Sequence, residues 1–451
     1  MQGARSPGLR AAPSTGIQCS NGIQRVGLVP TPRMDKREQD CRPRGSRKQS
    51  RPNRRAKSMR YIGIDVASET HVVAVVNEEE VVLHKPTPFK EDAAGYQRLR
   101  EIVGSAEEAH VGMEATGHYW QNLFAFLSAE GFQVSVVNPL RTRRFAEEDL
   151  RRAKTDAIDS IGIARFLRQK RPSPTVLPSE QLLELRELVR LRDRLVQDMV
   201  DRVNQLHRVV DLGFPEFTNH VKDLSSSLAT ALLERHGTAQ SFDRAREGEL
   251  ANIIYDGRRA VGRDLARELI NAARSSVGKH HGAAYDLQAK YACQDIQLLR
   301  DRIRALETDI HKAVSKDELG TLLTSIDGIG PNTSARIIAE VGDPANFASA
   351  SALAAYIGAV PQTKNSGKRT SDRASMTRIG HAKLRAKLWM PTLVAATKRN
   401  PWLQAFYRRL RNKGKPAKVA LVASMRKLIA AIYSVAKNRR PFVLRLNTPT
   451  A

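Results

Sequence analysis

The sequence predicts an α/β domain near the N-terminus, then long paired helices, then a mostly α-helical C-terminal domain. Three observations lead to this fold class. Short apolar strands alternate with helical stretches over residues 60–137. Apolar residues recur at helical spacing over 179–212 and 284–314, and cations are interleaved with apolar residues beyond 319. At 451 residues, the chain has room for two or three domains.

Five strands are expected in the first part of the chain, each a short apolar run that ends at a turn residue or an acid. They cover residues 61–65, 71–76, 81–83, 109–114 and 133–137. Helices are expected over 95–103 and 119–130, and another begins near Thr155. Three strands in a meander, followed by alternating helix and strand, is the order of an RNase H-like α/β domain.

The middle of the chain is predicted to form an α-helical coiled-coil region. From Ser179 to Leu212 apolar residues recur at helical spacing, charged residues fill the gaps, and no Pro or Gly interrupts. A similar stretch runs from Ala284 to Val314. Long, highly charged amphipathic helices of this kind usually pair as an antiparallel hairpin or coiled coil. The last region continues as helices, with a loop-rich insert around residues 361–377.

These patterns divide the chain into five parts. We predict a disordered basic tail over 1–58, an RNase H-fold catalytic domain over 59–175, a coiled-coil region over 176–316, a C-terminal domain over 317–443 and a tail over 444–451. Met59 stands directly before the first strand. The basic tail is therefore either an upstream extension of the reading frame or a functional basic arm.

The charge of the chain favours a polyanionic partner, and nucleic acid is the commonest one. The chain has 74 Lys and Arg against 47 Asp and Glu, a net charge of +27. Residues 1–60 carry a net +12, and residues 361–443 carry a net +20 with Asp372 as their one acid. In the second block the cations alternate with apolar residues at helical spacing, which predicts folded helices with a basic face.

Composition also excludes several classes of protein. Cys19, Cys41 and Cys293 are too few and too scattered for a disulfide scaffold or a cysteine-rich zinc module, and they suit a reducing cytoplasm. No run approaches about 18 consecutive apolar residues, which argues against a membrane span, and the N-terminus lacks an apolar signal core. We therefore expect a cytoplasmic protein with no membrane partner.

Four acidic residues predict a metal site. Asp65 and Glu114 each end an apolar strand, and in α/β sheets acids at the carboxyl ends of strands point into the crevice where ligands bind. Asp156 and Asp159 lie three residues apart at the start of a helix, so they share one face. Four carboxylates at one edge suit Mg²⁺ or Mn²⁺, and two such ions can catalyse cleavage of a phosphodiester.

Each acid also has an ordinary explanation. Asp156 is favoured in a first helical turn by the helix dipole, behind a cap at Thr155. Asp65 and Glu114 are common turn residues at the end of a strand. The metal site is the stronger hypothesis only for all four acids together, in this order on this strand pattern.

Several segments resemble a known family. The stretches Gly63–Ala67, Gly112–Gly117 and Lys154–Asp159 resemble the DEDD motif of a large family of bacterial insertion-sequence transposases, whose N-terminal domain is similar to the Holliday-junction resolvase RuvC. The resemblance continues in the C-terminal transposase domain, through Ser325–Gly330, Ala354–Gly358, Ser366-Gly367 and Ile379–Arg385. It spans about residues 60–443.

The resemblance implies a mechanism and partners. Asp65, Glu114, Asp156 and Asp159 would hold Mg²⁺ or Mn²⁺, and Ser366 would be the nucleophile that forms a covalent link to a cut DNA strand. Members act as RNA-guided recombinases whose structured bridge RNA pairs with donor and target DNA. They assemble from homodimers into tetramers, in which the serine of one subunit completes the acidic site of another.

The residues around Ser366 are consistent with that role, and a simpler explanation also fits them. Lys364, Lys368 and Arg369 flank the serine and would hold a scissile phosphate, while an acidic metal site would help to remove the hydroxyl proton. A serine in such a loop is usually a solvated turn residue. Ser371 and Ser375 are close enough in sequence to be rivals.

Other residues are candidates for nucleic-acid contacts. Gly328 and Gly330 lie before a helix expected near 333–340 and resemble a helix-hairpin-helix turn, whose backbone N–H groups bind phosphate; a plain helix-to-helix turn fits equally well. Further candidates for backbone contacts to DNA or RNA are Lys383, Arg385, Lys387, Arg408, Arg409, Arg411 and Lys418. The histidines show no metal-ligand spacing, and His118 and His381 receive no role.

The sequence therefore predicts a DNA transposase that cuts and rejoins DNA through a divalent-metal site and a serine adduct, acting in the bacterial cytoplasm at the nucleoid. Two other functions fit the same residues. A junction resolvase or nuclease would use the acids alone, with water attacking the phosphodiester. A non-catalytic nucleic-acid-binding scaffold would use the acids only as structural groups.

Overall fold

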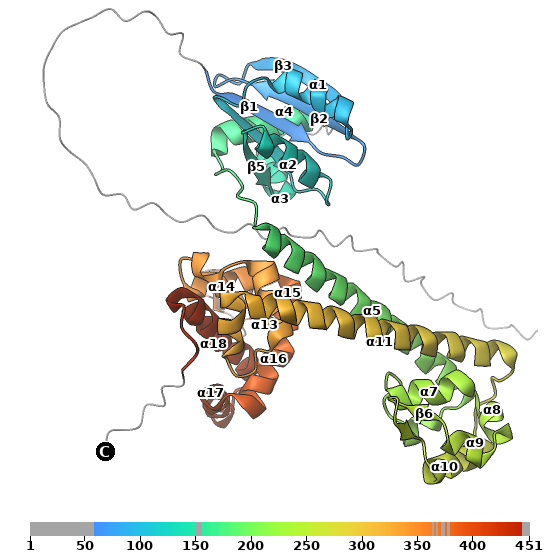
Figure 1. Ribbon diagram of the computed structural model, residues 1–451. Helices are drawn as coiled ribbons and strands as arrows, with labels where there is room; N and C mark the ends of the chain where they lie inside the picture. The colour runs from blue at the N-terminus through green and yellow to red at the C-terminus, as the bar shows by residue number, and fades with distance from the viewer. Residues whose placement is uncertain are drawn as a thin grey trace, which may run out of the picture. The chain divides into compact units, whose positions relative to one another are not determined.

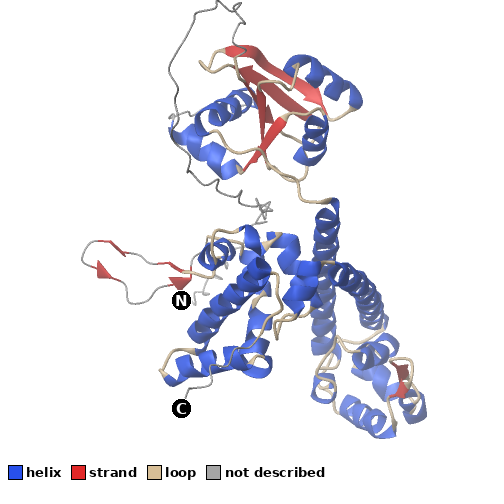
Figure 2. Cartoon of the chain, turned by 60° about the vertical axis from the view of Figure 1, so that its left-hand side comes forward, coloured by secondary structure: helices blue, strands red, loops and turns tan. Residues whose placement is uncertain are grey.

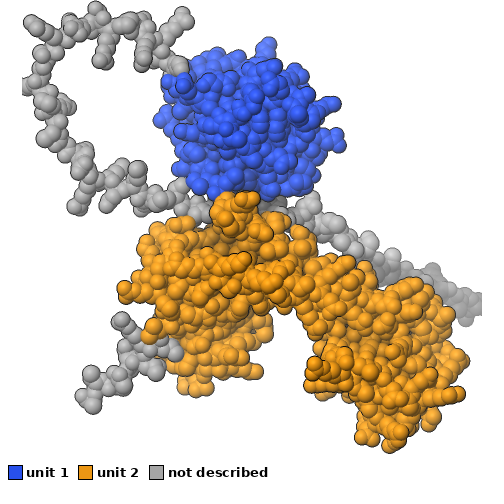
Figure 3. All heavy atoms as spheres, viewed as in Figure 1, with its two compact units in different colours: residues 1–28, 34–177 blue, residues 29–33, 178–451 orange. Residues whose placement is uncertain are grey.

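The computed structural model describes residues 58–148, 156–362, 365–366, 369–370, 375–376 and 379–443. These residues form two compact units that divide between Leu177 and Pro178 (Figure 3). The predicted tail over 1–58, apart from Ser58, and the predicted tail over 444–451 lie outside the described residues.

Unit 1 is built on a mixed sheet of five strands (Figure 1). Its order is β3-β2-β1-β4-β5. Strands β1 and β4 are parallel, as are β4 and β5, whereas β2 pairs antiparallel with both β1 and β3. The strands are β1 (Arg60–Asp65), β2 (Thr70–Val76), β3 (Val82–Lys90), β4 (Ala109–Glu114) and β5 (Gln133–Val137).

Two pairs of helices cover the two faces of this sheet. Ile62, Ile64 and Met113 point to one face, where they share a buried core with α1 (Ala93–Val103) and α2 (Trp120–Ala129). On the opposite face Tyr61 packs on α4 (Asp156–Lys170), and Val137 packs on α4 and on α3 (Pro139–Glu148). The alternation of side chains along each strand thus separates two cores.

The predicted α/β layout of this part of the chain is confirmed, with two differences of detail. Strand β3 is longer than the predicted strand over 81–83. Helix α3 was not predicted, because only Thr142 and Phe145 of its ten residues are buried and the segment therefore shows no clear apolar period. Asn138 starts this helix by accepting a hydrogen bond from the backbone N–H of Leu140, at 2.9 Å.

Unit 2 is mostly helical, and two 34-residue helices extend through it. These are α5 (Glu180–Gly213) and α11 (Ala283–Lys316), and they run antiparallel (Figure 1). Arg192 pairs with Glu307 at 2.5 Å, and ten residues further along α5 Arg202 pairs with Asp295 at 3.1 Å. The packing confirms the prediction that these two long amphipathic segments are helices that lie against each other.

One end of the α5–α11 pair lies in a small helical core. Leu206, Val210 and Cys293 are buried there. Burial and the charge of Glu234 raise the pKa of the Cys293 thiol to about 12, so this cysteine is an apolar core residue at neutral pH. The elements are α6 (Phe217–His220), α7 (Ser227–Arg235), α8 (Ala239–Arg244), α9 (Glu247–Ala251), α10 (Arg263–Arg274) and the hairpin of β6 (Ile254–Tyr255) and β7 (Arg259–Ala260).

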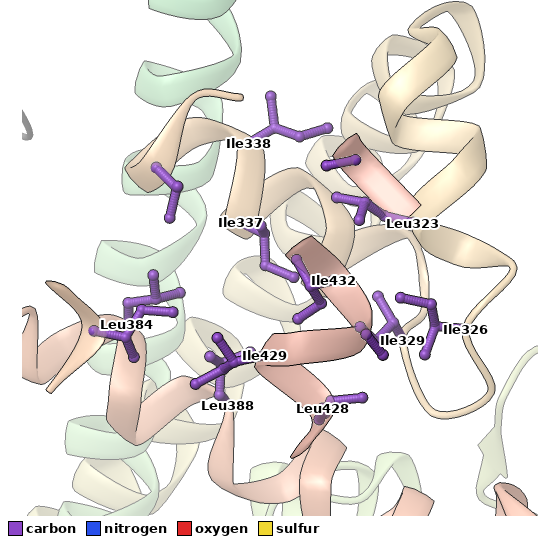
Figure 4. Close-up of a cluster of buried hydrophobic side chains, with 14 of the residues drawn as sticks. Leu323, Ile326, Ile329, Ile337, Ile338, Leu384, Leu388, Leu428, Ile429 and Ile432 are labelled. Atoms are coloured by element: carbon purple, nitrogen blue, oxygen red, sulfur yellow. The ribbon is translucent and has the colours of Figure 1, made fainter. Parts of the chain in front are cut away.

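The other end of the α5–α11 pair lies in the core of the C-terminal helices (Figure 4). Ile337 of α13, Ile429 of α18 and Leu388, which lies between α15 and α16, belong to this core. The elements are α12 (Glu318–Thr324), α13 (Pro331–Val341), α14 (Ala350–Ile357), α15 (Ala382–Lys387), α16 (Trp389–Val394), α17 (Pro401–Asn412) and α18 (Ala417–Asn438). A π-helical turn, η2 (Ala395–Arg399), follows α16.

Helix α18 is long and apolar enough, by length and composition alone, to cross a membrane. More than half of its most apolar stretch, 56%, is buried inside the protein. Leu421, Met425, Leu428 and Ile432 are among the residues that it contributes to the C-terminal core. Packing within the fold therefore accounts for its composition.

Candidate active site

Asp65 and Glu114 end two neighbouring parallel strands. The register pairs Ile64 of β1 with Met113 of β4, so the next residue on each strand, Asp65 or Glu114, lies at the same level. Adjacent strands in a sheet are about 4.8 Å apart. The two carboxylates therefore start from neighbouring points at the carboxyl edge, where ligands bind in α/β sheets.

Both acids start from the face of the sheet that α4 covers. A Cβ on Gly63, two residues before Asp65, would lie 2.0 Å from the carbonyl oxygen of Ser160 in α4. A Cβ on Gly112, two residues before Glu114, would overlap a leucine side chain of the same helix. Because side chains two apart share a face, Asp65 and Glu114 lie on the α4 side. The two glycines let α4 approach the sheet this closely.

The first turn of α4 carries Asp156 and Asp159. Asp159 immediately precedes Ser160, whose carbonyl contacts β1 at Gly63. The N-terminal turn of α4 therefore lies over the end of β1, on the same face as Asp65. The fold thus brings this turn, Asp65 and Glu114 to one corner of the sheet, and a metal site made by the four acids stays a prediction.

The described residues contain no group of three or more His, Cys, Asp or Glu side chains arranged to hold a metal ion. The carboxylates share the donor chemistry of a hard-cation site and one corner of the sheet, but their oxygens do not converge on one point. Residues 149–155, directly before α4, lie outside the described residues. The acids match a divalent cation in donor type, and binding of one cation by all four stays a prediction.

Helix α3 supplies a contact to Glu114 that the sequence did not predict. The hydroxyl of the buried Thr142 lies 2.5 Å from Glu114 Oε1 and 3.0 Å from the carbonyl oxygen of Pro139. A hydroxyl that donates to a carboxylate fixes its rotamer and stabilises its charged form. The segment carried no signal for this contact, because a single threonine in a charged stretch is unremarkable.

A buried histidine holds the turn that follows Asp65. His71 Nδ1 accepts the backbone N–H of Ala67 at 3.3 Å, so the ring carries its proton on Nε2, which lies 2.6 Å from Glu91 Oε2. Burial acts to raise the pKa of Glu91, but hydrogen bonds from His71 and Tyr96 outweigh it and lower the pKa below 4.5. A charged Glu91 therefore orients His71, and His71 fixes the turn.

In unit 2, Ser366 belongs to one of two short antiparallel strand pairs. β8 (Pro361–Gln362) pairs with β11 (Ser375–Met376), and β9 (Asn365–Ser366) pairs with β10 (Arg369–Thr370). Ser366 pairs with Arg369 in the β9–β10 ladder. Figure 2 shows these strands beside the helices of unit 2. Lys364, Lys368 and Ser371 lie outside the described residues.

The two ends of the segment that carries Ser366 meet at a pair of glycines. A Cβ on Gly380 would lie 2.6 Å from the Cα of Gly358, and both glycines have positive φ, so the close approach requires both. Arg385 Nη1 donates to the carbonyl oxygens of Ile357 and Gly358, at 3.1 and 3.5 Å. This arginine therefore fixes the end of α14, which is a structural contact at a residue predicted to bind nucleic acid.

His381 follows these glycines and caps α15. Its Nδ1 accepts the backbone N–H of Leu384 at 3.1 Å, so Nε2 carries the proton and lies 3.0 Å from Glu340 Oε2. Burial acts to raise the pKa of Glu340, but the bond to His381 and the nearby charges of Arg190 and Arg186 lower it below 4.5. His381, which received no role from the sequence, thus joins α15 to α13.

Gly328 and Gly330 lie in the turn between α12 and α13. Gly328 has φ of 100°, and a Cβ there would lie 2.6 Å from the Cβ of Ala395. Gly330 is the residue before Pro331, the first residue of α13. The tight packing of Gly328 explains one glycine of the predicted helix-hairpin-helix turn by structure alone, and phosphate binding by this turn stays a prediction.

The other residues predicted to contact nucleic acid differ in whether they already contact another part of the protein. Lys383 is exposed and has no ion-pair partner among the described residues. Lys387 lies 3.5 Å from Asp193, Arg408 lies 3.4 Å from Gln404, and the Arg409 guanidinium lies 5.2 Å from the centroid of the Phe406 ring. Arg411 donates to the carbonyl of Lys415, and Lys418 is exposed.

Comparison with known proteins identifies the family. A family model described as a transposase of the DEDD, IS110 type matches residues 62–215, and a model of the IS116/IS110/IS902 transposase family matches residues 320–408. The chain belongs to this family of transposases. The four predicted acids of the transposase lie in the first matched segment, and Ser366 lies in the second.

Similar proteins extend over nearly the whole transposase. The pilin gene-inverting protein of Moraxella bovis is 25% identical over 86% of this chain and 99% of its own length. An uncharacterized 44.8 kDa protein of insertion element IS116 from Streptomyces clavuligerus is 26% identical over 85% of this chain and 96% of its own length. The mini-circle putative transposase for IS117 of Streptomyces coelicolor is 26% identical, with 85% and 95% covered.

Proposed function

We propose that this transposase cuts and rejoins DNA at an acidic divalent-metal site, with Ser366 as the nucleophile. The single observation that carries the proposal is the register of β1 and β4, which sets Asp65 and Glu114 abreast on the face that the first turn of α4 approaches. The membership of the chain in a transposase family supports action on DNA.

The topology of unit 1 supports an RNase H-like, RuvC-like fold for the catalytic domain. A five-stranded sheet in the order 3-2-1-4-5, with β2 antiparallel to its neighbours, follows the meander and the alternating helices and strands expected of that fold. Acids on the first and fourth strands and on a helix packed against them are consistent with a nuclease-type centre.

Mg²⁺ or Mn²⁺ bound there would act as a Lewis acid on the phosphodiester and lower the pKa of an attacking hydroxyl. The residues that would hold it are Asp65, Glu114, Asp156 and Asp159. Thr142 orients the carboxylate of Glu114, and the His71–Glu91 pair fixes the turn after Asp65. These contacts would limit the motion of Glu114 and of the turn after Asp65, and so would reduce the reorganisation that binding requires.

The serine step is a transesterification. Ser366 Oγ attacks phosphorus, a phosphoserine ester forms, and the bond from phosphorus to one deoxyribose oxygen breaks, so that the proton lost from serine ends on that oxygen. Attack by the hydroxyl of another strand reverses the step and releases the serine. One phosphoester bond is exchanged for another in each step, so rejoining needs no external energy source.

Nucleic-acid partners follow from the charge of the chain. The net +27 and the block of +20 over 361–443 favour a long polyanion, and we propose donor and target DNA together with a structured guide RNA. We further propose homodimers that assemble into tetramers, with the serine of one subunit serving the acids of another. Such a protein acts on the chromosome in the cytoplasm.

The competing function is a water-using nuclease or resolvase. It is favoured by one observation, that all four acids belong to unit 1, whereas Ser366 belongs to unit 2. Water attack leaves no covalent link between protein and DNA, so the two functions predict different products from the same substrate.

The test is a search for a protein–DNA adduct. The transposase is incubated with Mg²⁺, RNA transcribed from the DNA beside its gene and end-labelled DNA of the element, and the products are separated on a denaturing gel. We expect a labelled band at protein size that protease removes and that S366A abolishes, with S375A as the matched control that retains it. Cleaved DNA without any adduct would establish the water-using function instead.

A further inference from the structure

An aromatic platform on α17 and α18 gathers two cations. Trp402, Phe406 and Arg409 follow one another at helical spacing, so they share one face of α17. Lys427 of α18 reaches this face from the neighbouring helix. Its Nζ lies 5.7 Å from the ring centroid of Trp402 and 5.4 Å from that of Phe406. The guanidinium of Arg409 lies 5.2 Å from the same Phe406 ring.

The ring of Phe406 is not part of the C-terminal core. It is partly exposed and lies outside the C-terminal core cluster, whereas its neighbours Leu403, Trp402 and Tyr407 all belong to that cluster or pack against it. What Phe406 does contact is two positive charges, one from each helix. Its contacts therefore suggest that it serves to hold Lys427 and Arg409 near each other.

These two cations lie in a stretch of sequence that carries no acid. Neither Lys427 nor Arg409 has an ion-pair partner among the described residues, and the sequence from 379 to 443 contains no Asp or Glu. Two like charges held beside one ring repel each other, and each ring contact offsets only part of that repulsion. One anion that contacts both cations would offset this repulsion.

The geometry points to a phosphate-binding site in which Lys427 Nζ and the Arg409 guanidinium engage phosphodiester oxygens of a nucleic-acid strand, with Phe406 as the positioning residue that contacts both. This inference deepens the proposed binding of nucleic acid but does not depend on the metal or the serine. Lys427 and Arg409 lie beyond the residues that the family models match. Contacts to phosphate alone give affinity without base preference.

Binding is measured by fluorescence anisotropy with labelled oligo-dT and oligo-U, in EDTA, over a series of NaCl concentrations. The logarithm of the affinity falls linearly with the logarithm of salt, with a slope of about 0.7 for each phosphate contact to a single strand. We expect K427Q and R409Q each to reduce this slope by about 0.7 on at least one probe. The probe that responds identifies the strand as DNA or RNA.

Variants at Phe406 separate a binding role from a structural one. F406L keeps both charges but removes the ring, and we expect weaker binding at every salt concentration, whereas F406Y keeps the ring and should bind as the parent protein does. K437Q is the matched control for K427Q, because Lys437 is an exposed cation that lies on α18, as Lys427 does, and has no aromatic contact among the described residues. Its slope should not change.

An unchanged slope in both K427Q and R409Q would overturn the inference. So would equal binding by F406L and F406Y in samples with the same melting temperature. The D65A variant distinguishes the phosphate site from the proposed catalysis. It should bind both probes as the parent protein does, so a loss of strand transfer in D65A reports on the acidic site and not on phosphate binding. Failure of the catalytic prediction would therefore not contradict the phosphate site, and failure of the phosphate site would not contradict the catalytic prediction.

Discussion

The acidic corner of the sheet in unit 1 and the basic helices at the end of unit 2 differ in how their charge is placed. In unit 1, strand register and two glycines bring the elements that carry a few carboxylates to one corner of the sheet. In the C-terminal helices, cations are spread over α15, α17 and α18 with no acid in the same stretch. The first arrangement depends on individual positions, and the second depends mainly on total charge.

This difference predicts different responses to substitution. Chemistry at one point fails when a single group moves by about 1 Å, since reacting groups must keep their geometry. Binding by many phosphate contacts weakens in small steps, because each cation contributes separately.

The largest effect is expected at Gly63. A Cβ there would lie 2.0 Å from the carbonyl oxygen of Ser160 and 2.5 Å from the backbone nitrogen of Ala164, so G63A must push α4 away from β1. We expect a loss of about 1–3 kcal/mol in the free energy of unfolding of unit 1. Strand transfer should fall by at least about a hundredfold, because Asp159 and Asp156 move with the helix.

Gly162 gives the matched control in the same helix. A Cβ there meets nothing within 4 Å, so G162A should stabilise α4 by about 0.5–1 kcal/mol and leave activity unchanged. Urea unfolding and strand-transfer assays measure both variants. If G63A were as active as G162A, the close approach of α4 to β1 would have no part in the chemistry.

An intermediate effect is expected at Glu340, whose carboxylate is bonded to His381 among the C-terminal helices. Its pKa in the folded protein lies below the ordinary 4.5, so it stabilises the fold above that pH, and this stabilisation is lost as the pH falls below 4.5 toward the folded value. We expect E340Q to unfold about 1–2 kcal/mol more easily at pH 7.

The pH series in urea provides the check on this prediction. Between pH 7 and pH 3.5 the parent protein should lose more stability than E340Q, because the variant has no carboxylate to protonate at this position. Equal losses in the two proteins would show that the bond from His381 and the charges of Arg186 and Arg190 do not favour the ionised carboxylate.

The smallest effect is expected at Lys383. This exposed lysine has no ion-pair partner among the described residues, so K383Q should leave the melting temperature unchanged and reduce the salt slope of duplex DNA binding by about 0.9, the value for one phosphate contact. Gel-shift titrations at several salt concentrations give the slope. A collapse of binding in this one variant would contradict the idea that the basic helices bind through many separate contacts.

The sequence predicted much of the fold, because the strands and the long helices have clear apolar periods. It located the ends of β1 and β4 to within a residue, and therefore the places of Asp65 and Glu114. It missed α3 and with it Thr142, since a charged helix with two buried residues carries little periodic signal. It could not show that Gly63 and Gly112 set the position of α4, because that depends on a contact between distant segments.

Other features depend on tertiary contacts that no local pattern encodes. His71 appeared only as part of a strand, although it is fully buried and bonded to Glu91. Arg385 was predicted to bind nucleic acid from its charge, yet it donates to the backbone carbonyls at the end of α14. The roles of Lys427 and Phe406 emerged only when α17 and α18 were seen side by side.

The proposed mechanism requires that Asp65, Glu114 and the acids of α4 form one binding site for divalent cations. It is tested most directly by titrating the protein with Mn²⁺ and measuring free Mn²⁺ by electron paramagnetic resonance. We predict saturable binding that D65N and E114Q each weaken by at least about tenfold, while D198N, which removes an exposed acid on α5, leaves it unchanged. Equal Mn²⁺ affinity in all four proteins would contradict the account.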